Sequence, residues 1–151
     1  MITLLAIGRK HDTWIEDGLE RYQKRLKQPW DIKWELVPHS SLEGARARQE
    51  ESERTLARLD DHMYVILLDE TGQPLTSPAL ATYLEQRFVL SQPVTLVIGG
   101  AYGVSDQLKS RADFIWSLSP LVFPHQLVRL IVVEQLYRAQ TIMRGQSYHN
   151  N

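Results

Sequence analysis

The chain has 151 residues, 43% hydrophobic and 23% charged, a composition that argues against intrinsic disorder and suits one globular domain. It contains no Cys, which excludes disulfides, zinc–thiolate sites and thiol nucleophiles. The formal net charge is −1, so the basic excess typical of a free-standing nucleic-acid binder is absent, and any contact with nucleic acid must be local.

The amino-terminal residues form a short apolar run over positions 4–7 that no basic segment precedes. This pattern favours a first strand over a signal peptide. No window reaches the roughly 20 apolar residues that a membrane-spanning helix needs. We therefore expect a soluble, cytoplasmic protein without membrane contact, and a single domain over residues 1–151.

Strand and helix patterns alternate along the chain. The first half is predicted to contain a strand over 2–8, a helix over 12–27 with Asp12 as its N-cap, a strand over 32–38 and a solvated helix over 41–62. A strand over 64–68 follows, which a turn at 69–72 closes, and then a helix from the cap Ser77 to about 89. The last predicted elements are a strand over 94–99, a helix over 105–111, a strand over 114–118 and a helix over 125–143. This alternation predicts an α/β domain with a largely parallel sheet.

Two loops at predicted strand ends are candidates for ligand binding. The first contains Gly99, Gly100 and Gly103 and is either a simple turn or a close backbone approach to a cofactor. It is not the dinucleotide fingerprint, which has the pattern G-x-G-x-x-G after an early strand. The second loop runs from residue 119 to 125, with apolar residues between two prolines. It is either a buried crossover or a wall around an apolar ligand ring.

The predicted last helix carries further candidates. His125 stands at its start and is either a cap or a neutral base whose pKa the helix dipole lowers. The helix is apolar on more than one face, which predicts burial against the sheet on one side and against a partner subunit on the other. Within this apolar helix we expect Arg129, Glu134 and Arg138 to make paired contacts.

The first predicted helix has a basic face formed by Arg21, Lys24 and Arg25. A solvated helix face is the more common role of such a pattern, and an RNA-phosphate patch is the alternative. The five His residues are scattered and no Cys accompanies them, so we expect no metal site.

Taken together, several motifs resemble the ribosomal RNA large subunit methyltransferase H family, which are minimal SPOUT-class methyltransferases. The resemblance covers the whole length of the chain, and its carboxy-terminal string is highly specific. The motifs are Asp69-Glu70-Thr71-Gly72, Ile98-Gly99-Gly100-x-x-Gly103, Leu118-Ser119, Phe123-Pro124-His125-Gln126-x-x-Arg129-x-x-x-x-Glu134-Gln135-x-Tyr137-Arg138-Ala139 and Gly145-x-x-Tyr148-His149.

The resemblance implies a SPOUT-type α/β-knot, in which the carboxy-terminal chain forms a trefoil knot, a rare exception to ordinary topology. It also implies a homodimer that uses S-adenosylmethionine to methylate N3 of a pseudouridine in 23S (large-subunit) rRNA. The substrate would be the assembled ribosome, whose shared surface would explain the missing basic excess. A SPOUT enzyme acting on tRNA and a ribosome-associated dimer without catalysis are the alternatives.

Carried over position by position, the resemblance implies cofactor contacts at Leu68, at Gly100 and along the loop of Ser119, Pro120, Leu121, Val122, Phe123 and Pro124, with Gly99 and Gly103 shaping the same pocket. The candidate catalytic residues are His125, Tyr148 and His149. Tyr148 is expected to stack on the target base, and His149, His125 or solvent to accept its imino proton. Gln73 and the Asn150–Asn151 tail depart from the family pattern, which has basic residues there.

Overall fold

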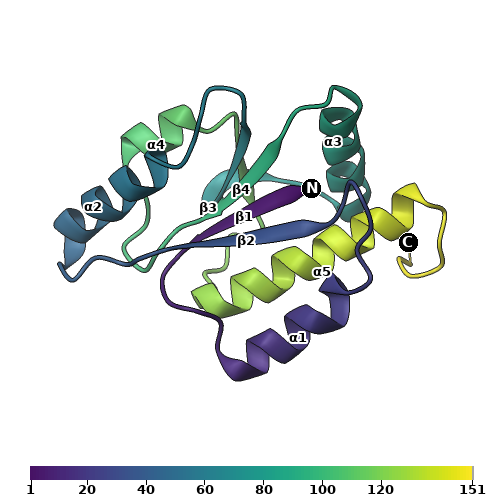
Figure 1. Ribbon diagram of the computed structural model, residues 1–151, viewed down its shortest axis with the longest axis horizontal. Coiled ribbons are helices and arrows are strands. Elements are labelled where there is room, and N and C mark those ends of the chain that lie inside the picture. The colour runs from purple at the N-terminus through teal and green to yellow at the C-terminus, as the bar shows by residue number, and fades with distance from the viewer. Residues whose placement is uncertain (151) are drawn as a thin grey trace.

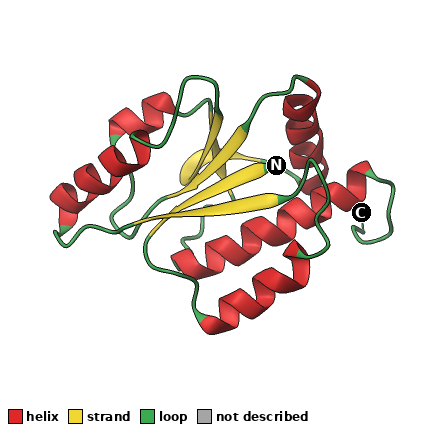
Figure 2. Ribbon diagram, in the orientation of Figure 1, coloured by secondary structure: helices red, strands yellow, loops and turns green. Residues whose placement is uncertain are grey.

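The computed structural model describes residues 1–150, and its centre is a five-stranded sheet in the order β2-β1-β4-β3-β5. Every pair of neighbouring strands is parallel (Figures 1 and 2). The strands are β1 (Ile2–Ile7), β2 (Ile32–Val37), β3 (Tyr64–Pro74), β4 (Val94–Ile98) and β5 (Phe114–Ser117). The predicted α/β class and parallel sheet are therefore confirmed.

Helices cover both faces of the sheet. Helices α1, α3 and α5 pack together on one face, and α2 and α4 lie together on the other (Figure 1). Their bounds are α1 (Thr13–Gln23), α2 (Gly44–Leu56), α3 (Ser77–Val89), α4 (Asp106–Arg111) and α5 (His125–Met143). Because both faces are covered, the central strands carry continuous apolar runs, as buried parallel strands usually do.

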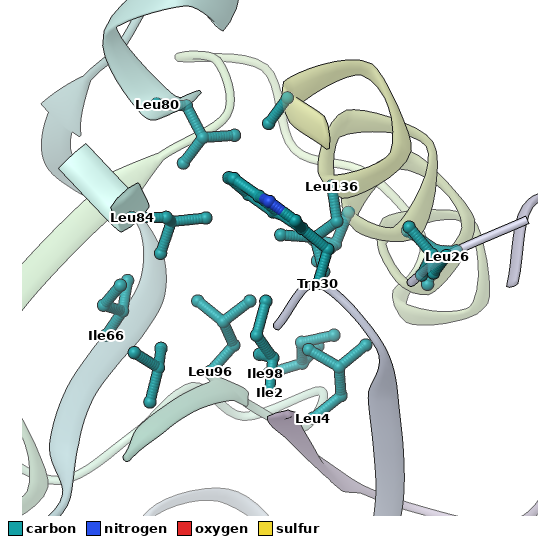
Figure 3. Close-up of a cluster of buried hydrophobic side chains, with 14 of the residues drawn as sticks. Ile2, Leu4, Leu26, Trp30, Ile66, Leu80, Leu84, Leu96, Ile98 and Leu136 are labelled. Carbon is teal, nitrogen blue, oxygen red and sulfur yellow. The ribbon is translucent and has the colours of Figure 1, made fainter. Parts of the chain in front are cut away.

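Alternate residues of each strand supply two separate cores. On β1, Leu4 and Ala6 face the larger core under α1, α3 and α5, whereas Leu5 and Ile7 face the smaller core under α2 and α4. In the larger core, Trp30 lies among side chains from α3 and α5 (Figure 3). Its ring packs edge-on against Phe88 at a centroid separation of 4.9 Å. Packing on both faces keeps the carboxyl ends of the parallel strands side by side at one end of the sheet.

Strand β3 is longer than the sequence predicts. The turn expected at residues 69–72 is wrong, because the strand continues to Pro74 after an irregularity that follows Leu68. Beyond that irregularity, Gln73 pairs with Trp116 and Pro74 with Ser117 of β5. As a result, Asp69 and Glu70 lie beside the starts of the two candidate loops.

Helix boundaries also differ in detail from the prediction. Helices α1 and α2 are shorter than the expected ranges 12–27 and 41–62. Asp12 is the N-cap residue of α1, but its side chain makes no capping hydrogen bond. Thr76, and not Ser77, caps α3, since its Oγ1 accepts a hydrogen bond from the amide of Ala79 at 3.2 Å. The Ser77 hydroxyl instead donates to Gln135 Oε1 at 2.6 Å, which ties α3 to α5.

Much of the second apolar face of α5 contacts other helices of the same chain. Helix α1 packs on one side of α5 and α3 on another, and a Cβ added at Gly18 of α1 would lie only 3.0 Å from Leu130. The apolar pattern that predicted a partner subunit on α5 therefore has an explanation inside one chain. The homodimer and the trefoil knot stay predictions that the resemblance implies. No helix within residues 1–150 combines the length and the apolar character that crossing a membrane requires.

Candidate functional site

A cleft opens where β4 and β5 end, beside the irregularity of β3 that follows Leu68, and the carboxyl ends of the strands are the usual place for ligands in an open parallel sheet. It brings together nine residues predicted from the sequence: Leu68, Gly99, Gly100, Gly103, Ser119, Leu121, Val122, Phe123 and His125. The other two predicted cofactor residues, Pro120 and Pro124, do not line the cleft. The two candidate loops thus form one site.

The glycine loop forms one side of this cleft. The amide of Gly103 donates to the Gly100 carbonyl at 3.1 Å, which closes a tight turn. Gly103 has a φ of 79°, a left-handed conformation that favours glycine, and a Cβ added there would meet no atom within 4 Å. At Gly100, by contrast, an added Cβ would lie 2.7 Å from Glu51 Oε1. The backbone at Gly100 therefore lies directly against the buried Glu51 carboxylate.

The loop from Ser119 to Pro124 forms the opposite side. The Leu121 amide donates to Ser119 Oγ at 3.0 Å, and the Ser117 hydroxyl donates to the Ser119 carbonyl at 3.1 Å. Leu121 and Val122 are 68% and 81% exposed although they are apolar. A bound apolar or aromatic group would cover them, which favours the ligand-wall interpretation over a buried crossover.

Sequence reasoning missed several cleft residues, which are Asp69, Glu70, Ile98, Val104, Leu118 and Val128. Asp69 was placed in a turn because four polar or small residues follow Leu68. The Lys109 ammonium lies 3.4 Å from its carboxylate. Burial raises the pKa of Asp69, but hydrogen bonds from Thr71 and Glu70 and the Lys109 charge outweigh that effect and lower it. An ionised Asp69 gives the cleft rim a negative charge.

His125 lines the cleft at the first turn of α5. Burial, and then the positive charge of Arg129, lower the pKa of His125, while the negative charge of Glu51 opposes them. Its imidazole is therefore neutral at pH 7, a state in which it can accept a proton. Arg129 is 1% exposed and bonds the Arg9 carbonyl at 3.0 Å and His11 Nδ1 at 3.2 Å. The partners of Arg129 are thus a backbone carbonyl and an imidazole, and no carboxylate within residues 1–150 forms an ion pair with it.

The chain end docks on the far half of α5. We call the group of Glu134, Tyr137, Arg138, Tyr148 and His149 the tail cluster. Glu134 Oε1 accepts hydrogen bonds from Arg138 Nη2 at 2.6 Å and from the Tyr148 hydroxyl at 3.0 Å. Arg138 Nη1 lies 3.2 Å from His149 Nδ1, and its guanidinium stacks 4.7 Å from the Tyr148 ring centre. The predicted pairing of Glu134 with Arg138 is confirmed.

The tail cluster also contacts α1 and the residues that directly follow it. The Tyr137 ring lies 4.9 Å from the Tyr148 ring and 5.8 Å from the Tyr22 ring, measured between centres. The Arg25 guanidinium lies 5.9 Å from the Tyr137 ring centre. Burial and the hydrogen bond to Glu134 raise the pKa of Tyr148, so its hydroxyl stays protonated at neutral pH. Aromatic rings with basic side chains between them are a common surface for unstacked bases.

The cleft and the tail cluster lie at opposite ends of α5. The helix begins at the edge where the strands end and runs to the other edge, where the chain terminus lies (Figure 1). His125 and Glu134 are nine residues apart on α5, which corresponds to about 14 Å along the axis. Within one chain, Tyr148 and His149 do not line the cleft that holds His125. The three candidate catalytic residues are therefore not brought together in a single chain.

A family model described as "Predicted SPOUT methyltransferase" matches residues 1–149. The chain belongs to the SPOUT methyltransferase family. The similarity to individual members is also close. A protein of Acetivibrio thermocellus named ribosomal RNA large subunit methyltransferase H is 38% identical over 156 aligned residues, which cover 98% of each chain. A protein of the same name from Syntrophotalea carbinolica is 39% identical and covers 99% of this chain and 98% of its own.

One solved structure has a similar fold. A probable methylase family protein from Haemophilus influenzae Rd KW20 aligns with 99% of this chain and 70% of its own, with a TM-score of 0.55 at 12% identity. The family resemblance drawn from the sequence motifs is confirmed, and with it the assignment of the chain as a methyltransferase. For this SPOUT methyltransferase, the cleft at the ends of β4 and β5 and at the irregularity of β3 is the candidate active site.

Proposed function

We propose that this chain transfers a methyl group from S-adenosylmethionine to N3 of a pseudouridine in 23S rRNA of the assembled ribosome. The observation that carries the proposal is the joining of the two candidate loops in one cleft, in a chain whose similar relatives are named ribosomal RNA large subunit methyltransferases. The reaction would take place in the cytoplasm, because its substrate is the ribosome.

The residues of the cleft fit this cofactor. Apolar side chains of Val104, Leu118 and Val128 suit an aromatic ring, and the loop of residues 119–124 offers backbone amides and carbonyls to read the edge of that ring. The acidic rim at Asp69 and Glu70 suits a ligand with net positive charge. The bound cofactor supplies an activated methyl group on a sulfonium, so the chain has only to align the acceptor nitrogen and exclude water.

The RNA side of the reaction falls to the tail cluster of a partner subunit. Because Tyr148 and His149 lie far from the cleft of their own chain, we infer a homodimer in which the tail cluster of one chain stands over the cleft of the other. Tyr148 offers a flat ring for the extruded base, a contact worth about 1–3 kcal/mol on aromatic platforms. Arg25 and Arg138 lie beside these rings and suit the adjoining phosphates.

The imino proton at N3 has to leave before or during the attack on the methyl group. His125 is neutral at pH 7 and lines the cleft, which makes it one acceptor. His149, which lies at 3.2 Å from Arg138, is the other protein group within the proposed composite site. Solvent is the third acceptor. Single substitutions His125→Asn and His149→Asn separate the three, because only the true acceptor's loss changes the pH dependence of methyl transfer.

The purified protein with methyl-labelled S-adenosylmethionine tests this function. Whole ribosomes, separated large subunits and total tRNA are offered in parallel, all from cells lacking the enzyme. We expect label in large-subunit rRNA of whole ribosomes and none in tRNA. Label in tRNA supports a tRNA methyltransferase instead. Cofactor binding without transfer to any of the three supports a ribosome-associated protein without catalysis.

A further inference from the structure

Helix α2 carries a buried carboxylate that the proposed reaction does not use. Glu51 is 3% exposed, although most of α2 is polar and faces solvent. Its Oε2 accepts a hydrogen bond from the Ser40 amide at 2.9 Å. Its Oε1 has no hydrogen-bond partner within residues 1–150, and no basic side chain there forms an ion pair with it. A buried charge without a cationic partner is costly, so its retention calls for a reason.

This carboxylate lies directly behind the glycine loop of the cleft. A Cβ added at Gly100 would lie 2.7 Å from Glu51 Oε1 and 3.5 Å from Glu51 Cδ, so the carboxylate lies against the backbone of a residue that lines the cleft. The charge also reaches His125 on the opposite wall, where it raises the pKa of that imidazole. Glu51 therefore acts across the cleft without lining it.

The charge of each other acidic group of the cleft is either paired with a cation or exposed to solvent. Asp69 has the Lys109 ammonium at 3.4 Å, and Glu70 is exposed to solvent. Water and counterions screen exposed charges strongly and buried charges much less. The buried Arg129 cation, which also acts on His125, is present whatever stands at position 51. Glu51 is thus the acidic group whose field at the cleft is screened least.

The methyl donor and its product differ by one charge at the cleft. S-adenosylmethionine carries a positive sulfonium, whereas S-adenosylhomocysteine has a neutral thioether once the methyl group has left. We propose that the buried carboxylate of Glu51 favours the charged methyl donor over the neutral product, so that the donor displaces the product from the cleft. The inference rests on the proposed function, because it requires that this cofactor binds in the cleft. A site with a uniform affinity for both ligands would be inhibited by its own product.

Calorimetric titration of both ligands tests the role of Glu51. In Glu51→Gln the charge is lost, but an oxygen remains for the Ser40 amide. The measured quantity is the dissociation constant of S-adenosylhomocysteine divided by that of S-adenosylmethionine. We expect this ratio to fall about tenfold, or about 1.4 kcal/mol, mainly through weaker binding of S-adenosylmethionine. Glu51→Asp should keep most of the discrimination. The matched control is Glu53→Gln on the exposed face of α2, where a charge is likewise lost and an oxygen remains for Gln49 Nε2, and its ratio should not change.

Two outcomes would overturn the inference alone. One is an unchanged ratio in a Glu51→Gln protein with the thermal midpoint of the wild type. The other is an equal loss of affinity for both ligands, which would assign Glu51 a purely structural role beneath the loop. A wild-type protein that binds neither ligand would instead refute the proposed function, and the inference with it.

Discussion

Removing the Tyr148 hydroxyl should release the chain end from α5. In Tyr148→Phe the ring keeps its edge-on contact with Tyr137 and its stacking with Arg138, whose ring-centre and guanidinium distances are 4.9 Å and 4.7 Å. The hydrogen bond to Glu134 Oε1, at 3.0 Å, is lost together with the contact of the hydroxyl with Tyr22. The substitution therefore removes the polar contacts of one hydroxyl and keeps the ring.

A hydrogen bond to a charged group contributes about 1.5–3 kcal/mol. The Glu134 side chain is only 18% exposed, so solvent screening reduces this contribution little. A loss near the lower limit raises the undocked fraction of the tail by about tenfold. Glu134→Gln should have a larger effect, because it also weakens the two bonds from Arg138 Nε and Nη2 at 3.0 Å and 2.6 Å. The effects of Tyr148→Phe and Glu134→Gln should not add, since both act on the hydrogen bond between Tyr148 and residue 134.

Hydrogen exchange followed by mass spectrometry measures docking of the chain end. The protection of the peptide that follows Gly145 should fall by about tenfold in Tyr148→Phe, and methyl transfer to ribosomes should fall with it while cofactor affinity stays unchanged. Tyr102→Phe is the control, because the Tyr102 hydroxyl makes no hydrogen bond to any of residues 1–150 and the ring is 42% exposed. Equal protection in Tyr148→Phe and the wild type would refute the docking of the tail by Glu134.

Three further outcomes are expected. Val128→Trp fills the cleft wall and should weaken S-adenosylmethionine binding tenfold or more, or about 1.4 kcal/mol, whereas Val89→Trp, at a site 74% exposed on α3, should bind normally in the same titration. The free energy of unfolding in urea should fall as the pH drops from 7 to 5, because burial and the Arg129 charge lower the pKa of His125 and His11 below the 6.5 of the unfolded chain. The unfolded state then binds more protons than the folded state in this pH range. A free energy of unfolding that does not change with pH would contradict this reasoning. Sedimentation at micromolar concentration should give a dimer, and a stable, fully active monomer would contradict the composite site.

From the sequence, Gly100→Val would be the obvious substitution to test cofactor binding in the cleft. The structure shows that its effect could not be assigned to the ligand space alone. From the sequence alone, its methyl groups point into the ligand space. In the structure the added Cβ meets Glu51 Oε1 at 2.7 Å, so the substitution would displace the buried carboxylate before it blocked a ligand. Local sequence shows that a glycine is needed at this position but not which neighbour lies against it.

The elements with strong local patterns were predicted well. The last helix was expected over 125–143 and is observed at His125–Met143, because an apolar run flanked by a proline and a glycine has clear ends. The first strand was expected over 2–8 and ends one residue earlier, at Ile7. Both cores follow from this alternation of apolar strands and helices.

The features set by distant contacts could not be predicted. The extension of β3 to Pro74 depends on pairing with β5, some 40 residues later in the chain, and its own residues have the composition of a turn. The burial of Glu51 is equally hidden, since it is one of several Glu residues in a polar helix and only the fold places it against Gly100. The partner of Arg129 could not be named from the sequence either, because a backbone carbonyl such as that of Arg9 leaves no sequence pattern.

The carboxy-terminal tail shows the same limit. Its specific motif indicated a role for Tyr148 and His149, but final residues often fray, and only the structure shows their bonds to Glu134 and Arg138. The departure at Asn150 ends the described chain, and Asn151 lies outside the described residues. The departure at Gln73 lies in β3, where it pairs with Trp116 of β5.

Mass spectrometry of 23S rRNA from a strain that lacks this protein tests the central claim most directly. The account predicts that one pseudouridine of large-subunit rRNA lacks its N3 methyl group in that strain and regains it when the wild-type gene is restored. The Val128→Trp protein should fail to restore it. An unchanged methylation pattern of large-subunit rRNA in the deletion strain would contradict the account.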